Sequence, residues 1–181
     1  MTQRALDGPY IYFVTTNVKS RRRFFVSADR ATRLAKIIVT ACQMKHFWLL
    51  GYCILPNHFH LLVYNQNLGV RALERARHGE EDVKTQPQST DSYPWRGLSS
   101  PRTFTLGDLM QSIKGNFSWQ FSTGQFWQTR FIFKIVNDKR YLENVIDYAR
   151  FNYRKMNLPE SFGQAPFVSI DQQAIDHIFN P

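Results

Sequence analysis

The sequence predicts an α+β fold of the ferredoxin-like type: a βαββαβ order that forms an antiparallel sheet with helices on one face, followed by a C-terminal helix. Short runs rich in aromatic and β-branched residues alternate with longer segments whose apolar residues recur at helical spacing. The two central runs are separated only by Pro56-Asn57, a break that favours an antiparallel hairpin. Hydrophobic residues make up 43% of the 181 residues, enough for one domain with its own core.

Local sequence signals mark where the predicted strands end and where the predicted helices begin. The first aromatic and β-branched run ends at Asn17, as expected of a strand. Ser27, Thr105 and Asn137 stand where helix N-caps are expected, each before a segment with helical periodicity. The predicted strands cover residues 10–16, 47–54, 58–64 and 130–136, and the predicted helices cover roughly residues 28–45, 105–121 and 138–155.

Two segments fall outside this pattern. Residues 66–103 are rich in Arg, Glu, Ser, Pro and Gln, so we interpret them as a surface insertion in a domain that spans residues 1–158. Residues 159–181 are expected to form an irregular C-terminal tail, with a final turn near residues 170–179.

The chain is strongly basic, and many basic residues lie near its start. Its formal net charge is +9 at pH 7. Residues 1–36 carry eight basic residues against two acidic ones, a net charge of +6. A polyanionic partner is favoured, because each Lys or Arg that neutralises a phosphate releases a condensed counterion. The alternative is a basic surface with no partner.

The cysteines and the hydropathy pattern favour a reducing, cytoplasmic setting. Cys42 and Cys53 each lie in an apolar run, and the sequence contains no CxxC zinc pattern. The segment after Met1 has no apolar core typical of a signal peptide. The longest nearly apolar stretch, residues 47–55, is much shorter than the roughly 20 residues that a bilayer-spanning helix needs.

The sharpest local motif is Leu55-Pro56-Asn57-His58-Phe59-His60-Leu61-Leu62-Val63. Side chains alternate between the faces of a strand, so His58 and His60 project together while Phe59 points to the core. Two neutral imidazoles at this spacing can hold one divalent ion, although such a pair also occurs by chance. The start of a strand near the sheet edge is open to a substrate, and we therefore predict a metal site here.

The last predicted helix offers a third ligand and a nucleophile. Tyr148 and Asn152 are four residues apart and are therefore neighbours on the helix surface. The amide oxygen of Asn152 could complete a site for a hard cation, and the phenol of Tyr148 becomes a useful nucleophile when a cation or base favours the phenolate. The alternative is that Tyr148 lies at the boundary of the core and Asn152 is solvated.

These motifs resemble those of a known family. Residues 55–62 look like the histidine–hydrophobe–histidine (HUH) motif of the single-tyrosine (Y1) transposases of the IS200/IS605 type, and the REP-associated tyrosine transposases are the closer match. Residues 108–115 resemble the family's second helix, residues 126–131 its entry into the last strand, and residues 138–152 the helix that bears its nucleophile. The resemblance covers roughly residues 8–158, apart from the insertion.

The resemblance implies a transposase and endonuclease that cleaves and rejoins single-stranded DNA beside REP-like hairpins, as a monomer or homodimer. His58 and His60 would bind Mg²⁺ or Mn²⁺ with Asn152 as third ligand, and the metal would polarise the scissile phosphate. Tyr148 would attack phosphorus, leaving a 5′-phosphotyrosine on one DNA end and a free 3′-OH on the other.

The chain departs from the family pattern at three points. The family usually has Asn-Pro after the tyrosine turn of the catalytic helix, whereas Tyr153 follows Asn152 here. The last strand often carries a polar residue such as histidine where this chain has Lys134, and the insertion is longer than expected. Tyr141 and Tyr153 therefore stay open as alternatives to Tyr148. Helical spacing turns Tyr153 into the apolar stripe and puts Tyr141 two turns from Tyr148.

Basic and aromatic residues outside these motifs are candidates for contact with DNA. A basic turn after the first strand is expected to contact phosphates along the hairpin stem, which follows from its charge as much as from the family. Trp127 and Phe131 either stack on unpaired bases or, as we favour, belong to the core. The candidates for phosphate contact are Lys19, Arg21, Arg22, Arg23, Lys114 and Arg130.

Two other functions are compatible with the same residues. A non-cleaving protein derived from a transposase would bind DNA or RNA hairpins, although it would not need the histidines, Tyr148 and Asn152 all intact. A metal-dependent hydrolase would use His58 and His60 to activate water and would form no covalent intermediate.

Overall fold

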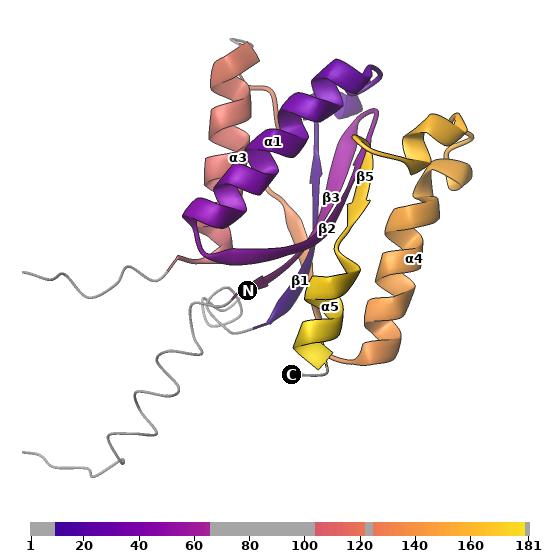
Figure 1. Cartoon of the computed structure of the whole chain (residues 1–181). Helices are drawn as coiled ribbons and strands as arrows, with labels where there is room; N and C mark the ends of the chain where they lie inside the picture. Colours follow the sequence, from indigo (N-terminus) through magenta and orange to yellow (C-terminus); the bar gives the residue numbers. More distant parts are fainter. Residues whose placement is uncertain (1–9, 66–103, 122–124, 180–181) are drawn as a thin grey trace, which may run out of the picture.

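The structure, a computed structural model, describes residues 10–65, 104–121 and 125–179. A five-stranded antiparallel sheet in the order β4-β1-β3-β2-β5 lies between two layers of helices (Figure 1). The strands are β1 (Ile11–Asn17), β2 (Phe47–Leu55), β3 (His58–Asn65), β4 (Ile132–Val136) and β5 (Val168–Ile170). The helices are α1 (Ala28–Met44), α3 (Leu106–Phe121), α4 (Lys139–Lys155) and α5 (Gln172–Phe179), with 3-10 turns η2 (Lys19–Arg21) and η3 (Glu160–Gly163).

The predicted α+β fold is confirmed. β1 to β4 have the order and the antiparallel pairings of a ferredoxin-like sheet, with β1 and β3 in its centre. α4 follows β4 as the predicted C-terminal helix. Its cap is one residue later than predicted: Asp138 rather than Asn137 is the N-cap, and its carboxylate accepts a hydrogen bond from the backbone N–H of Tyr141 at 2.7 Å.

The helices cover both faces of the sheet rather than the single face that we predicted (Figure 1). On the face with α1 and α3, Phe59, Leu61 and Val63 of β3 belong to the larger core. On the face with α4 and α5, Leu50 and Leu62 form a smaller core with residues of both helices. β2 and β3 are apolar on both faces, so both faces must be covered to remove these side chains from water.

Residues 159–179 contain regular structure where we predicted an irregular tail. β5 adds a fifth strand beside β2, with Gly51 opposite Ile170, and the turn predicted near residues 170–179 is the helix α5. A side chain would not fit at Gly51, because its Cβ would lie 2.6 Å from Cδ1 of Ile170 and 2.9 Å from the carbonyl oxygen of Ser169. A three-residue strand carries too little periodicity to be predicted from sequence.

The remaining expectations concern the insertion, the cysteines and the membrane. The insertion at residues 66–103 lies outside the described residues, so it and the domain boundaries stay predictions. Cys42 and Cys53 are buried, as predicted, and burial raises the pKa of each thiol to about 12. Within the described ranges, no helix is long and apolar enough to cross a membrane.

Candidate active site

His58 and His60 lie at the start of β3, on the sheet face that α4 covers. Because side chains alternate along a strand, this face is opposite to the one from which Phe59 enters the larger core. The two imidazole rings are nearly perpendicular, and their centroids are 4.9 Å apart. His60 is 4% exposed and His58 is half-buried. The structure thus brings the two histidines together as their spacing predicts.

Each histidine is oriented by a hydrogen bond at Nδ1. Nδ1 of His58 lies 2.6 Å from Oδ1 of Asn57, and because that oxygen only accepts, the imidazole N–H donates. Nδ1 of His60 lies 2.9 Å from the hydroxyl of Thr15, which is opposite His60 in the pairing of β1 with β3. When both Nδ1 atoms donate, both Nε2 atoms keep their lone pairs. Metal-binding histidines usually have such a partner on the second nitrogen.

Burial keeps both imidazoles neutral at physiological pH. It lowers the pKa of His58 to about 4, and the positive charge of Arg21 adds to this effect. It lowers the pKa of His60 to about 3, with a smaller contribution from His58. Because only a neutral imidazole can bind a metal, this environment favours the form of each side chain that acts as a ligand.

Asn152 enters the same site from α4. Its side chain is 4% exposed, and its amide Nδ2 lies 3.1 Å from Nε2 of His60. Rotation of the amide by 180° exchanges its oxygen and nitrogen, so either atom can take that position. The alternative in which Asn152 is solvated is therefore wrong, because the amide is buried against the histidine.

Tyr148 lies one turn before Asn152 on α4 and contacts His60. The centroids of the two rings are 5.3 Å apart at an interplanar angle of 72°. Phe13 of β1 packs edge-on against Tyr148 at 6.0 Å and stacks on His60 at 5.2 Å. Nζ of Lys155 lies 4.9 Å from the centre of the Tyr148 ring. The phenol is half-buried and is therefore held by its neighbours without being closed off from solvent.

A cleft of about 370 Å³ opens beside Tyr148 and His60. β4, which forms one wall, is an edge strand, and its Ile132 and Lys134 are exposed. The tyrosine is therefore accessible from the edge of the sheet. The cleft is lined by Phe13, Thr15, His60, Ile132, Lys134, Tyr141, Asn144, Val145 and Tyr148.

The structure separates the three candidate tyrosines of α4. The hydroxyl of Tyr153 accepts a hydrogen bond from Nε of Arg154 at 3.0 Å, and its buried ring lies against Gly163. Tyr141 lines the same cleft as Tyr148, but seven residues separate the two, about 10 Å along the helix axis. Tyr148 contacts the imidazole of His60, and this geometry favours it over both alternatives.

The basic turn after β1 adjoins the histidine hairpin. The backbone N–H of Val18 donates to the carbonyl oxygen of Asn57 at 2.9 Å, which fixes the turn beside the start of β3. Arg21 is close enough to His58 for its charge to lower the pKa of that imidazole. The turn is thus compatible with phosphate contact at the site, which stays a prediction. Its four basic residues, Lys19, Arg21, Arg22 and Arg23, are all exposed.

The other candidates for DNA contact have different surroundings. Nζ of Lys114 donates to the carbonyl oxygens of residues 128–129 at 2.7 and 3.0 Å, and burial lowers the pKa of this ammonium group. Trp127 is 4% exposed and donates its indole N–H to the carbonyl oxygen of Lys114 at 3.1 Å, so it belongs to the core, as we favoured. Phe131 is half-buried against the same core, and Arg130 is exposed.

Two residues of the site, Thr15 and Asn57, were not singled out from the sequence. Asn57 stands beside His58 within the motif, so its contact with that ring could have been inferred from proximity in the chain. Thr15 is 45 positions from His60, and only the register of β1 against β3 shows that they meet.

The gathered side chains fit a divalent cation that shares its coordination with the substrate. Among the described residues, no three His, Cys, Asp or Glu side chains gather in one place, so an amide would have to supply the third protein ligand of a metal. The amide nitrogen of Asn152 lies 3.1 Å from Nε2 of His60, and a 180° rotation of the amide would direct its oxygen to this side as a ligand. The donor set is uncharged, so phosphate oxygens are suitable additional ligands.

Comparison with known proteins first relates the chain to a class. The family described as "Transposase IS200 like" matches residues 9–73, which include β1, α1 and the whole histidine hairpin. Over this stretch the chain is therefore similar to the class of the IS200-type transposases.

Within this class, the similarity is to the REP-associated tyrosine transposases. A protein of Haemophilus influenzae named "Putative REP-associated tyrosine transposase" is 22% identical over 170 residues, covering 93% of this chain and 84% of that protein. A solved structure of a REP-associated tyrosine transposase bound to a REP hairpin superposes with a TM-score of 0.63 at 16% identity, covering 100% of this chain and 88% of that chain. The resemblance that the motifs indicated is therefore confirmed, and the described part of the chain shares the fold of this relative.

Proposed function

We propose that this protein is a metal-dependent single-stranded DNA transposase and endonuclease that cleaves and rejoins DNA beside hairpins through a 5′-phosphotyrosine intermediate. The observation that carries the proposal is the meeting of His60, Asn152 and Tyr148 in one buried corner beside an open cleft. The match to the IS200-like transposase family supports the same chemistry.

His58, His60 and Asn152 are the residues that would hold Mg²⁺ or Mn²⁺. When bound, the metal supplies Lewis-acid polarisation of the scissile phosphate and stabilises the charge that develops on it. Asn57 and Thr15 orient the two imidazole rings through Nδ1, and when Nδ1 donates, Nε2 is free to bind the metal. The low pKa of each histidine keeps it unprotonated at neutral pH.

Tyr148 is the proposed nucleophile. Its phenol oxygen forms a bond to phosphorus while the bond from phosphorus to O3′ of the preceding nucleotide breaks. The phenol gives up its proton and the leaving O3′ takes one, so the products are a 5′-phosphotyrosine and a free 3′-OH. The covalent link conserves the phosphodiester bond energy, and attack by another 3′-OH rejoins the DNA without ATP. Phe13 and His60 contact the tyrosine ring and orient it for this attack.

The proposed substrate is a single strand that carries a REP-like hairpin. The net charge of +9 and the exposed basic turn next to His58 favour a polyanion. The solved relative is bound to a REP hairpin, which supports the same kind of DNA here. Lys19 and Arg21 to Arg23 are the proposed phosphate contacts.

The test is a denaturing gel of protein incubated with end-labelled hairpin oligonucleotides, drawn from the DNA beside its gene, and Mn²⁺. We expect a slow band that carries the 5′-phosphate side of the cut. Tyr148→Phe and His58→Ala should abolish it, while Tyr153→Phe and Tyr141→Phe should keep it. Cleavage without an adduct would instead indicate a hydrolase that uses water. Binding without cleavage across all the hairpins would indicate a non-cleaving hairpin-binding protein.

A further inference from the structure

A polar groove of about 270 Å³ lies between α1 and α3, on the sheet face opposite α4. It contains two cations, two primary amides and a hydroxyl, and Ile37 is its one apolar lining residue. The polar lining residues are exposed, so their cationic and amide groups are available to a ligand in solution. The lining residues are Arg33, Lys36, Ile37, Thr40, Asn116 and Gln120.

Trp119 stands beside this groove on α3. It is 82% exposed, although tryptophan is among the residues with most to gain from burial. Trp119 is three residues after Asn116, so the two are neighbours on the helix surface. The indole is therefore a large exposed aromatic surface within reach of a ligand in the groove.

A line of arginines on aromatic rings joins this groove to the basic turn. The guanidinium of Arg33 lies 5.9 Å from the ring centre of Phe121, near the end of α3. Arg30, one turn earlier on α1, lies 4.4 Å from the ring centre of Phe24 and donates to the carbonyl oxygen of that residue at 3.1 Å. Arg22 lies 6.0 Å from the same ring. These contacts place the guanidinium groups in a row from the groove to the basic turn after β1.

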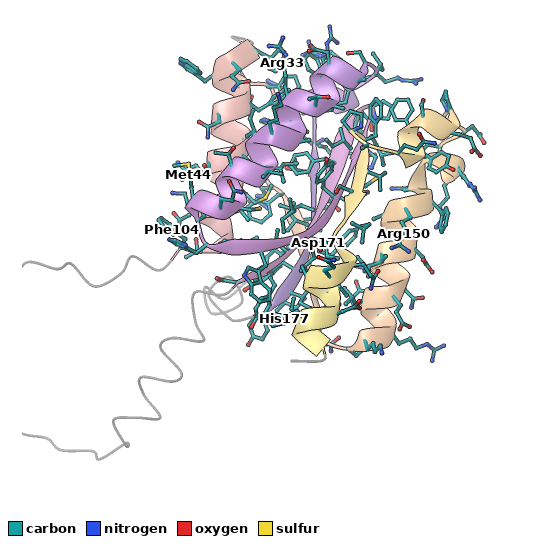
Figure 2. The ribbon with its side chains drawn as sticks, viewed as in Figure 1. Arg33, Met44, Phe104, Arg150, Asp171 and His177 are labelled. Atoms are coloured by element: carbon teal, nitrogen blue, oxygen red, sulfur yellow. The ribbon has the colours of Figure 1, made fainter. Side chains whose placement is uncertain are left out.

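The row ends beside the candidate active site. Arg21 follows in the same turn and is the residue whose charge acts on His58. Figure 2 shows Arg33 near the first turns of α1, at the end of the molecule opposite Met44 and Phe104. Arg33 is also paired with Asp29 at 3.2 Å, so Lys36 is the groove's unpaired cation among the described ion pairs, and the arginines of the row lie between the groove and the histidines.

We propose that the groove and Trp119 bind unpaired nucleotides of the DNA strand that the active site handles. Arg33 and Lys36 contact the phosphates, the amides of Asn116 and Gln120 contact base edges, and a base stacks on the indole of Trp119. Stacking on an indole requires an unstacked base, so the occupant is single-stranded. This inference rests on the proposed function for its choice of DNA, but its test does not need cleavage.

The experiment measures the anisotropy of fluorescein-labelled (dT)20 with the full chain carrying Tyr148→Phe, in EDTA, over a series of salt concentrations. Adding Trp119→Ala should raise Kd about tenfold through the lost stacking. Adding Lys36→Gln should reduce the slope of log K against log salt by about 0.7. The matched controls are Tyr10→Ala, which removes an aromatic side chain that is 41% exposed, and Lys139→Gln, which removes an exposed lysine at the start of α4. Thermal melts confirm that each variant is folded.

The outcomes separate this inference from the proposed function. If hairpins give the Tyr148 adduct but Trp119→Ala and Lys36→Gln bind (dT)20 as before, the groove proposal fails alone. If no hairpin gives an adduct but these two variants bind more weakly than the controls, the groove stands and the cleavage proposal fails. If the control variants lose as much affinity for (dT)20 as the Trp119 and Lys36 variants, the groove assignment is wrong. Tighter binding of (rU)20, with the same dependence on Trp119, would assign the groove to RNA and overturn the choice of DNA.

Discussion

The terminal amide of Asn152 lies 3.1 Å from Nε2 of His60, although 92 positions separate the two residues in the chain. β3 supplies the histidine from the middle of the sheet, and α4 supplies the amide because Val145 and Ile146 pack that helix on the smaller core. The contacts that hold the C-terminal helix on the sheet are therefore the same contacts that assemble the candidate metal site.

Replacing Asn152 should affect both stability and metal binding. Asn152→Ala removes a buried hydrogen-bonding partner of His60, and we expect a loss of about 1–2 kcal/mol in the free energy of unfolding. The same variant should bind Mn²⁺ more weakly, whereas Asn152→Asp should bind it more tightly because a carboxylate is a better ligand for a hard cation. Urea unfolding and Mn²⁺ titration by electron paramagnetic resonance measure the two effects. Equal Mn²⁺ affinities for the Ala and Asp variants would contradict the assignment. The control is Asn137→Ala, at an exposed asparagine outside the cleft.

Replacing the neighbouring threonines Thr15 and Thr16 by valine should affect metal binding differently. Thr15→Val removes the partner of Nδ1 of His60, and loss of such a partner typically weakens metal binding 10–100-fold. The hydroxyl of Thr16 is buried without a hydrogen bond among the described residues, so Thr16→Val should leave metal binding unchanged and should not lower stability. Mn²⁺ titration and thermal melts of the two variants make the comparison. A loss of affinity in both would point to a general disturbance of β1.

Stability should fall in mild acid because of the two buried histidines. Burial lowers the pKa of His58 to about 4 and of His60 to about 3, from 6.5, so the unfolded chain binds more protons below pH 6.5. The free energy of unfolding is therefore highest above pH 6.5 and decreases as the pH falls toward the folded pKa values. At pH 5 the loss is about 2 kcal/mol for each histidine.

Urea unfolding at pH 7 and pH 5 tests this dependence. His60→Gln should unfold with a smaller difference between the two pH values than the unaltered chain, because glutamine does not titrate. The acidic residues contribute equally to both proteins, so they cancel in the comparison. An identical pH dependence in the two proteins would show that His60 is protonated in the folded state or solvated in it.

Gly51→Ala should destabilise the packing of residues 159–179 without changing a residue of the candidate active site. The new methyl group would lie 2.6 Å from Cδ1 of Ile170 and 2.9 Å from the carbonyl oxygen of Ser169, so β5 has to move away from β2. Overpacking of this kind typically costs 1–3 kcal/mol. We expect a lower melting temperature and faster proteolysis within residues 159–179. The control is Gly115→Ala, at an exposed position of α3 where a Cβ would meet no other atom within 4 Å. This substitution should leave the melting temperature unchanged or raise it.

Local patterns in the amino-acid sequence were sufficient to predict the order of the elements from β1 to α4 and to name the candidate ligands. Periodicity of two along β3 was enough to put His58 and His60 on one face and Phe59 on the other, because the alternation of side chains is a local property of a strand. Spacing of four along α4 was enough to make Tyr148 and Asn152 neighbours for the same reason. The motifs of the resemblance are local in the same sense.

Which of these local features meet depends on the packing of the whole domain. The register of β1 against β3 brings Thr15 to His60, the packing of α4 on the second face of the sheet brings Asn152 and Tyr148 to the histidines, and β5 closes the far edge. Each contact joins residues far apart in the chain. These contacts form because apolar side chains are buried on both faces of β2 and β3, and that burial involves several segments at once.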